Sequence, residues 1–428
     1  MLLRRSVAGW LLLLTVLAAG LAALFDGAPK WPSGLLSWGA GILLWPDLPT
    51  ASRRPIGVLA TIGGAGLAFG IGLGQPPDWL MLVCANTALI ALLVSVSFLR
   101  LVSTPETAEH TALPSGASAL FSTLCGTHLF GAIINLSTIF IVGDRMAGAG
   151  RLSRVQALVL TRGFSTAAFW SPFFAAMAAA LTYAPGARVG TLFVLGAPLA
   201  VLALVVTYRE VNHLSAERFV GYPMRYDSLW LPSLLAILVL TVHSIYPELS
   251  VIGLVTLISP VLTLLVLGLK GGTEIRPMRR HVSGWLPLMV GELSLFLAAG
   301  VMAAGLKSVF MSLGEWLPFQ HFGGLEAVAT FLILTALAVV GVHPLIGIAA
   351  AGTVLAPAMS DPNLLALVFL ASWALGAVIN PISGLNLAFQ ARYGITGTTL
   401  MRWHRVYVIK MSAAVSAILL AYASVSSV

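Results

Sequence analysis

Two histidines inside long apolar stretches are the first candidates for chemistry in this sequence. His128 closes the run Gly126-Thr127-His128 in the stretch 117–142, and His343 closes Gly341-Val342-His343 in the stretch 324–358. An imidazole titrates near neutral pH, so each histidine could bind a solute or carry a proton. Each could equally hold a turn of the chain in place by hydrogen bonding. The sequence leaves both roles open.

A polar residue followed by proline occurs inside the apolar segment after each of these stretches, as Ser171-Pro172 and Asn380-Pro381. Proline inside a helix removes one backbone hydrogen bond and clashes with the preceding turn. In a bilayer such a break persists only where protein groups or water satisfy the freed carbonyls. Gly384 adds a second breaking residue after Pro381. The two dipeptides therefore predict two helices that are broken at membrane depth.

Broken helices and hairpin tips expose helix ends, and these ends define the expected chemistry. N-terminal ends suit an anion, whereas unwound carbonyls and C-terminal ends suit a cation. We predict that both histidine-containing stretches are hairpins, and that their tips meet the two breaks in one composite site for substrate and ion. The side chains predicted to line it are Thr127, His128, Asn135, Ser137 and Thr138 of the first hairpin, Ser165 and Ser171 of the first broken helix, His343 and Thr353 of the second hairpin, and Asn380, Ser383 and Asn386 of the second broken helix.

Arg162 and Glu292 are charged residues inside predicted spans, and charges in a bilayer mark functional sites by default. Arg162 joins the binding candidates, although it lies near the end of its span and could extend to the interface. Glu292 could carry a proton, or pair with Arg162 or a histidine, and is a secondary candidate. Asp144, also secondary, is expected to fix the inner end of the first hairpin together with Arg145. No catalytic residue, metal ligand or cofactor is predicted.

The composition indicates that the bilayer is the solvent of these groups. Of the 428 residues, 58% are hydrophobic and 9% charged, whereas soluble proteins carry about 25% charged residues. The apolar runs are continuous rather than alternating, which indicates membrane helices. Cys84 and Cys125 lie in apolar stretches and are predicted to be packing residues rather than a disulfide. The lack of a phosphate-binding loop argues against an ATP-driven protein.

Eleven transmembrane spans are predicted beside the two hairpins, with residues 1–25 as a retained span rather than a cleaved signal peptide. With the N-terminus inside, the inner loops hold eighteen Lys and Arg residues and the outer loops three. This bias predicts a bacterial inner-membrane protein with a cytoplasmic N-terminus and a periplasmic C-terminus. The predicted spans are 8–25, 34–49, 56–74, 79–99, 157–184, 189–207, 229–246, 250–269, 284–305, 364–390 and 405–426.

The two halves of the chain are related by a weak internal repeat. An offset of 215 aligns the hairpins, and an offset of 209 aligns the helices that follow them. Five predicted spans separate the hairpins, so the second hairpin opens to the opposite face of the membrane. Such inverted repeats occur in many secondary transporters, with the solute bound at the interface of the repeats.

This layout resembles the ion transporter superfamily, which includes the divalent-anion/sodium symporters and the large permease subunit of TRAP transporters. The topological resemblance covers nearly the whole chain, but the divalent-anion family carries Ser-Asn-Thr at both hairpin tips. Here the tips read Gly126-Thr127-His128 and Gly341-Val342-His343. The resemblance implies a homodimer with an elevator mechanism. The implied parts are scaffold helices 1–99 and 208–305, arms 100–116 and 306–322, and transport-domain halves 117–207 and 323–428.

The predicted function is therefore ion-coupled secondary transport of a small, anionic, organic acid-like solute, with H⁺ or Na⁺ as the coupling ion. No nucleic-acid partner is expected, because the formal charge of +8 lies in loops that set membrane orientation. Two alternatives stay open: a membrane-embedded transferase that uses His128 or His343, and a cation/proton antiporter of the same superfamily. A channel is disfavoured by the small polar content of the spans.

Overall fold

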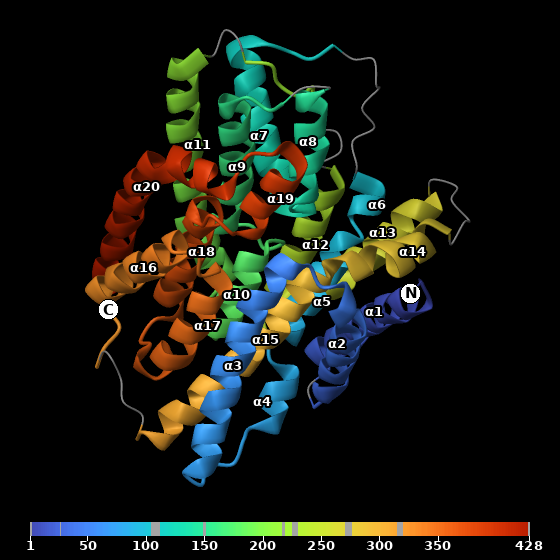
Figure 1. Ribbon diagram of the computed structural model, residues 1–428, viewed down its shortest axis with the longest axis vertical. Coiled ribbons are helices and arrows are strands. Elements are labelled where there is room, and N and C mark those ends of the chain that lie inside the picture. The colour runs from blue at the N-terminus through green and yellow to red at the C-terminus, as the bar shows by residue number, and fades with distance from the viewer. Residues whose placement is uncertain are drawn as a thin grey trace. The chain divides into compact units, whose positions relative to one another are not determined.

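The computed structural model describes residues 2–25, 27–103, 112–148, 151–215, 219–224, 230–269, 276–314 and 320–426. Apart from one isolated β-bridge, the regular structure in these ranges is helical (Figure 1). Nine helical segments within them are long and apolar enough to cross a bilayer. The chain is therefore a helical, multi-pass membrane protein, and its helices fall into two compact units.

Unit 1 comprises residues 1–104, 231–318 and 349–357. Its α-helices are α1 (Leu2–Leu24), α2 (Trp31–Leu44), α3 (Thr50–Gly72), α4 (Trp79–Cys84), α5 (Thr87–Ser97), α6 (Arg100–Ser103), α12 (Trp230–Ile245), α13 (Val251–Leu269), α14 (Arg276–Arg280) and α15 (Val290–Ser312). A π-helical turn, His281–Trp285, and a 3-10 turn, Leu286–Met289, join α14 to α15.

The pair α3 and α15 is the most closely packed contact of unit 1. A Cβ atom on Gly63 would overlap the carbonyl of Val301, and one on Gly66 would lie 2.6 Å from the carbonyl oxygen of Gly305. Small residues let two membrane helices approach until their backbones touch, which maximises dispersion contacts where no hydrophobic effect drives association. The glycines of α3 therefore fix this part of unit 1.

Three predicted spans of unit 1 differ from the structure. The span predicted over 229–246 is the 16-residue helix α12, which is not among the nine segments. The span predicted over 79–99 is interrupted between α4 and α5, where Asn86 adopts a left-handed conformation with φ of 60°. The side-chain amide of Asn86 donates to the carbonyl of Phe296 over 2.9 Å, which stabilises this break by a contact distant in sequence. The span predicted over 34–49 is a 14-residue helix, α2, followed by the 3-10 turn Trp45–Asp47, and it is not among the nine segments.

Unit 2 comprises residues 105–230, 319–348 and 358–428. Its α-helices are α7 (Gly116–Ile134), α8 (Ser137–Ala147), α9 (Arg154–Ser165), α10 (Ala175–Tyr183), α11 (Val189–Ser215), α16 (Gly324–Val339), α17 (Pro344–Leu355), α18 (Pro362–Ile379), α19 (Gly384–Tyr393) and α20 (Gly397–Val425). Residues 349–357, which include the larger part of α17, belong to unit 1 by their contacts.

Both interruptions predicted from proline are present in unit 2. The first broken helix consists of α9, a 3-10 turn (Thr166–Phe169) and α10, and the second consists of α18 and α19. Helix α18 is buried along nearly its whole length, and it contacts the first broken helix, α16 and α20. The two broken helices therefore form the core of unit 2.

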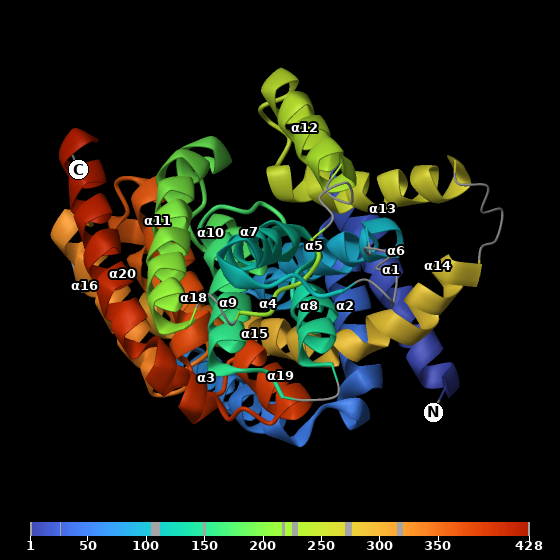
Figure 2. The ribbon, with the colours of Figure 1, turned by 90° about the horizontal axis from the view of Figure 1, so that it is seen from above.

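The first hairpin also lies wholly in unit 2. The chain reverses after α7, and α8 packs back against α7 and α9, so that the three helices lie side by side (Figures 1 and 2). Helix α9 begins with a capping box, in which Ser153 and Gln156 exchange side-chain and backbone hydrogen bonds. This cap satisfies amide groups that a helix start would otherwise leave unpaired.

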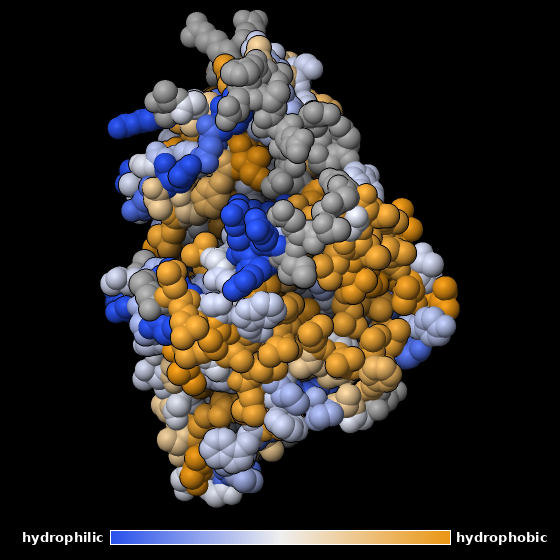
Figure 3. All heavy atoms as spheres, turned by 90° about the vertical axis from the view of Figure 1, so that its right-hand side faces the viewer, coloured by the Kyte–Doolittle hydropathy of each residue, from blue (hydrophilic) through white to orange (hydrophobic). Residues whose placement is uncertain are grey.

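The surface agrees with a lipid environment. Leu14, Leu17 and Leu21 follow helical spacing on α1, and each is more than two-fifths exposed. Apolar side chains cover much of the face shown in Figure 3.

Of the two predicted arms, residues 104–111 and 315–319 lie outside the described ranges, while 306–312 continue α15. Cys84 and Cys125 are both free.

Candidate functional site

The tip of the first hairpin is tied to the break in the first broken helix. Asn135 forms the turn between α7 and α8 with a positive φ of 52°, and its side-chain amide donates to the carbonyl of Phe173 over 3.4 Å. The hydroxyl of Ser171 donates in the other direction, to the carbonyl of Ala132 at the end of α7. Two side chains predicted for the site thus join the hairpin to backbone groups of the break.

The second hairpin and the second break are joined in the same way. The amide of Asn380 donates to the carbonyl of Val342 over 2.9 Å, and the backbone N–H of Ile382 donates to its side-chain oxygen, also over 2.9 Å. Val342 lies in the turn between α16 and α17, so the residue before Pro381 satisfies a carbonyl of the hairpin tip. In both halves, the polar residue before the proline makes this contact.

Asn386 bridges the two sides of the second break. Its side-chain amide donates to the carbonyl of Val378 over 3.1 Å and to that of Asn380 over 2.8 Å. The hydroxyl of Ser383 donates to the Ala377 carbonyl and accepts from the backbone N–H of Asn386. The carbonyls freed by Pro381 are therefore satisfied by protein groups, as a membrane environment requires.

The oxygen Oδ1 of Asn386 is the exception in this network. Asn386 is fully buried, and this atom accepts no hydrogen bond from the described residues. A buried acceptor without a donor is unfavourable by about 1–3 kcal/mol unless a ligand satisfies it. An amide oxygen beside helix carbonyls is a typical ligand of a hard cation.

His128 is held by three hydrogen-bonding groups. The indole N–H of Trp170 donates to Nε2 over 3.0 Å, so Nδ1 carries the proton and faces the hydroxyl of Thr166 at 2.9 Å and the carbonyl of Gly163 at 3.3 Å. Both ring nitrogens are thus engaged between α7 and the first broken helix. The contacts of His128 are those of a residue that holds the hairpin.

His343 has a different environment from His128. Its Nδ1 accepts the backbone N–H of Leu345 over 3.2 Å at the start of α17, and its ring lies edge-on to Trp373 with centroids 5.7 Å apart. The two histidines that align in the sequence are therefore not equivalent in structure. One joins two helices, and the other caps the helix that follows it.

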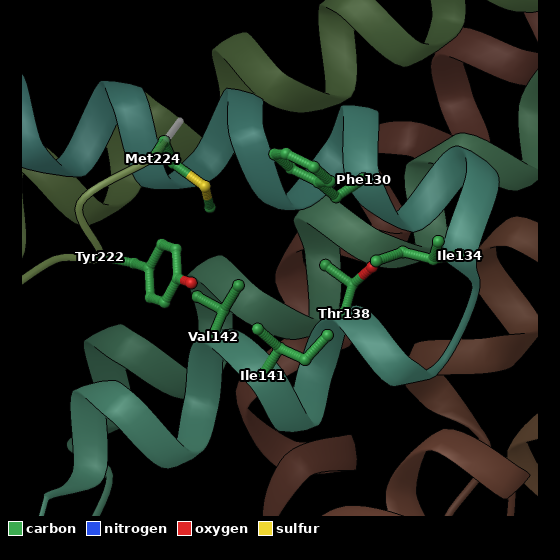
Figure 4. A pocket seen from close by; sticks show the side chains of 7 residues that line it. All are labelled: Phe130, Ile134, Thr138, Ile141, Val142, Tyr222 and Met224. Atoms are coloured by element: carbon green, nitrogen blue, oxygen red, sulfur yellow. The ribbon is translucent and has the colours of Figure 1, made fainter. Parts of the chain in front are cut away.

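Thr127 and Thr138 are buried, and their hydroxyls have no hydrogen-bond partner among the described residues. Thr138 lines an apolar hollow between the arms of the first hairpin (Figure 4). Ser137 is half-buried at the start of α8. Ser165 donates back to the carbonyl of Arg162 in its own helix over 3.4 Å. Thr353 donates to the Ala349 carbonyl and belongs to unit 1.

Arg162 lies in a buried cluster of unit 2. Its guanidinium makes a bidentate contact with Glu210 at 2.8 and 3.3 Å, and its Nε donates to Nδ1 of His404 over 3.1 Å. The ring of Tyr407 lies 4.4 Å below the guanidinium carbon. These contacts join α9, α11 and α20, so most donors of Arg162 are engaged by protein groups.

The two secondary candidates lie in separate units. Asp144, on α8, accepts two hydrogen bonds from Arg392 at 2.8 and 2.9 Å and one from Tyr393 at 3.0 Å. These contacts join the second arm of the first hairpin to the end of α19. Glu292 lies on α15 in unit 1, exposed beside apolar side chains of α1 and α5. Pairing with Arg162 was one of three possibilities for Glu292, and Arg162 instead pairs with Glu210.

Unit 2 therefore brings together most of the predicted residues. The two tips, the two breaks and the Arg162 cluster belong to this unit, whereas Thr353 and Glu292 belong to unit 1. Glu210 and His404 were not predicted, because both lie just outside predicted spans. The span of α11 was predicted to end at 207, whereas the helix continues to Ser215, and the last span was predicted to begin at 405, whereas α20 begins at Gly397. The apolar run that precedes Glu210 ends only a few residues before it. This was the signal in the sequence that the helix includes Glu210.

The helix ends at the two breaks differ in their capping. Helix α10 starts after Phe174 without a side-chain cap, whereas α19 is capped by Ser383. The first break thus presents the helix N-terminus that suits an anion, and the second break presents the unpaired amide oxygen of Asn386. No model of a protein family matches this chain, and no curated protein matches it significantly.

Proposed function

We propose that this protein is an ion-coupled secondary transporter of the ion transporter superfamily, which moves a small anionic solute by an elevator movement of unit 2. The observation that carries the proposal is the duplicated tether between a hairpin tip and a helix break, made by Ser171 in one half and by Asn380 in the other. Backbone irregularity at membrane depth is tolerated where it lines a binding site, and here it occurs twice in one unit.

Each break supplies a different part of the binding chemistry. The uncapped N-terminus of α10 carries partial positive charge and amide donors, which would recognise a carboxylate or a similar anion. The unpaired Oδ1 of Asn386 would ligate the coupling cation. Because an amide does not titrate in the physiological range, this oxygen favours Na⁺ over H⁺ as the ion at this position.

The transferase alternative is disfavoured by the contacts of the histidines. Both ring nitrogens of His128 are engaged by protein groups, and Nδ1 of His343 caps α17. A general base needs a free nitrogen within reach of a substrate proton. The cation/proton antiporter remains the second candidate, because the unpaired oxygen of Asn386 supports cation binding independently of an anion.

The proposal further includes a homodimer in the bacterial inner membrane with a cytoplasmic N-terminus and no cofactor. Purified protein in proteoliposomes tests the function directly, with Na⁺ or pH gradients imposed against a panel of small organic acids. We expect Na⁺-driven uptake, and we expect Asn386→Ala to weaken the Na⁺ dependence at least about tenfold, the equivalent of one lost ligand contact of about 1.4 kcal/mol. Asn212→Ala, an exposed asparagine on α11, is the matched control. Cation movement without any anion would favour the antiporter, and no gradient-driven movement of any tested solute would contradict both.

A further inference from the structure

The segment that follows α11, Phe219–Met224, is folded onto the open end of the first hairpin. Val220 forms an antiparallel β-bridge with Ser115, immediately before α7. Its carbonyl also accepts a hydrogen bond of 2.9 Å from the side-chain amide of Gln156, at the start of α9. This segment, called the strap below, is thereby fixed to both the hairpin and the first broken helix.

The strap inserts side chains between the helices of the hairpin. Tyr222 is 1% exposed, and its backbone N–H donates to the hydroxyl of Thr123 over 2.9 Å. The sulfur of Met224 packs so closely against Gly126 that a Cβ on this residue would overlap it. The first glycine of the Gly-Thr-His run therefore leaves room for the methionine side chain. In the sequence, only the histidine of this run suggested a functional role.

The side chains of Tyr222 and Met224 each face both arms of the hairpin, α7 and α8. Tyr222 and Met224 line one hollow together with Phe130 of α7 and Val142 of α8 (Figure 4). The lining is apolar, and the strap closes it on one side. Separation of α7 from α8 would therefore expose Tyr222 and Val142, which the seated strap keeps out of contact with water.

The strap also lies in the part of the chain that connects the two units. It follows α11, a helix of unit 2, and the chain continues from it to α12, whose residues from Leu231 belong to unit 1. The strap is thus part of a covalent connection between the two units. A displacement of one unit against the other would therefore pull on the strap through the chain.

We propose that the strap is a conformational latch that holds the arms of the first hairpin together while it is seated, and that must leave the hairpin during each transport cycle. This inference rests on the proposed function. Movement between the units withdraws Tyr222 and Met224, and withdrawal allows α8 to separate from α7. The latch thereby couples the movement of unit 2 to access at the first tip.

A labelling experiment tests the latch without any transport assay. Val142→Cys is placed in full-length protein that carries Cys84→Ala and Cys125→Ala, and its reaction with a water-soluble maleimide is timed. Val142 is 2% exposed, so slow labelling is expected. Tyr222→Ala and Met224→Ala, made separately in case one fails to fold, should each accelerate labelling at least about tenfold, because buried side chains that seal the site are lost. Tyr246→Ala, an exposed tyrosine in unit 1, should leave the rate unchanged. Equal rates in all variants would overturn the latch, whether or not the protein transports.

A reversible cross-link then tests the need for withdrawal. Residues directly opposed in an antiparallel pair lie about 4.5–5.5 Å apart at Cα, within the range of a disulfide, so Ser115→Cys with Val220→Cys can lock the strap. Oxidised protein should lose uptake, and reduction should restore it. Undiminished uptake in the oxidised state would overturn the proposal. If the labelling result holds but neither redox state nor the wild type transports any solute, the proposed function fails, while the role of the strap in holding the arms together stands.

Discussion

The side-chain amide of Asn380 donates a 2.9 Å hydrogen bond to the carbonyl of Val342, 38 residues earlier in the chain. Its counterpart in the first half is Ser171, whose hydroxyl donates to the carbonyl of Ala132. In both cases the residue before a helix-breaking proline holds the end of the preceding hairpin. The repeat in the sequence thus reflects a repeated tether, and this tether is a first target for mutation.

Replacement of Asn380 by Ala should destabilise unit 2. The change removes the donor to the half-buried Val342 and the acceptor for the backbone N–H of Ile382, and it leaves both groups without this partner. A loss of about 1–3 kcal/mol is expected. Thermal unfolding of the detergent-purified protein measures it, with the exposed Asn212→Ala as control. An unchanged unfolding temperature would show that the tether contributes nothing.

Adjacent glycines on α3 should respond in opposite ways to the same substitution. A Cβ on Gly63 would overlap the backbone of Val301, whereas a Cβ on Gly64 meets nothing within 4 Å. Gly63→Ala should therefore destabilise the protein by about 1–3 kcal/mol. Gly64→Ala should be neutral or stabilising, because alanine favours the helix. Thermal unfolding of the two variants side by side is the measurement, and similar losses in both would contradict close packing of α3 against α15.

Two ion pairs among the described residues of unit 2 should differ in their contribution to stability. Arg162 is fully buried against Glu210, so Arg162→Met leaves a carboxylate and His404 without their donor. The expected loss is about 3 kcal/mol, the lower end for a broken buried pair, since the Glu210 side chain is 22% exposed. Asp144→Asn breaks the exposed pair with Arg392 and should change stability little. Unfolding temperatures that fall equally in both variants would contradict this distinction.

Asp47 should make the stability of unit 1 depend on pH. A hydrogen bond from Arg5, with further support from Arg4, lowers the pKa of the Asp47 carboxyl below its ordinary value. Because the pKa is lower in the folded state, the stabilisation is complete above the ordinary pKa near about 4 and is lost as the pH falls through the folded-state pKa. Unfolding temperatures are measured from neutral pH to about pH 3, and the difference between wild type and Asp47→Asn should narrow once the pH falls below about 4. A constant difference across this range would rule out the linkage.

Local chemistry made the two proline breaks predictable, because proline disrupts a helix wherever it occurs inside one. The break at Asn86 was not predictable in this way. No proline or glycine marks it, and a donor bond to Phe296, 210 residues away, stabilises it. A break that depends on tertiary contacts leaves no local signal in the sequence.

The residues of the candidate site likewise divide into those that local sequence made predictable and those that depend on tertiary contacts. The sequence supplied Ser171, Asn380 and Asn386 because polar groups beside a helix break must satisfy its carbonyls. It did not supply the partners of Arg162, since Glu210 and His404 meet it only through packing of α9, α11 and α20. His128 and His343 were expected to be equivalent because they align in the sequence. Their environments differ in the structure, because each ring is oriented by neighbours that the repeat does not share.

The proposed transport mechanism depends most on two hairpins that open to opposite faces of the membrane. Single cysteines at Gly148 and Ser360, both exposed and each just beyond the second arm of one hairpin, report this directly in protein that carries Cys84→Ala and Cys125→Ala. A membrane-impermeant maleimide added to intact cells should label Ser360→Cys and should reach Gly148→Cys only after the membrane is permeabilised. Labelling of both positions from the same side would contradict the inverted repeat, and with it the proposed transport mechanism.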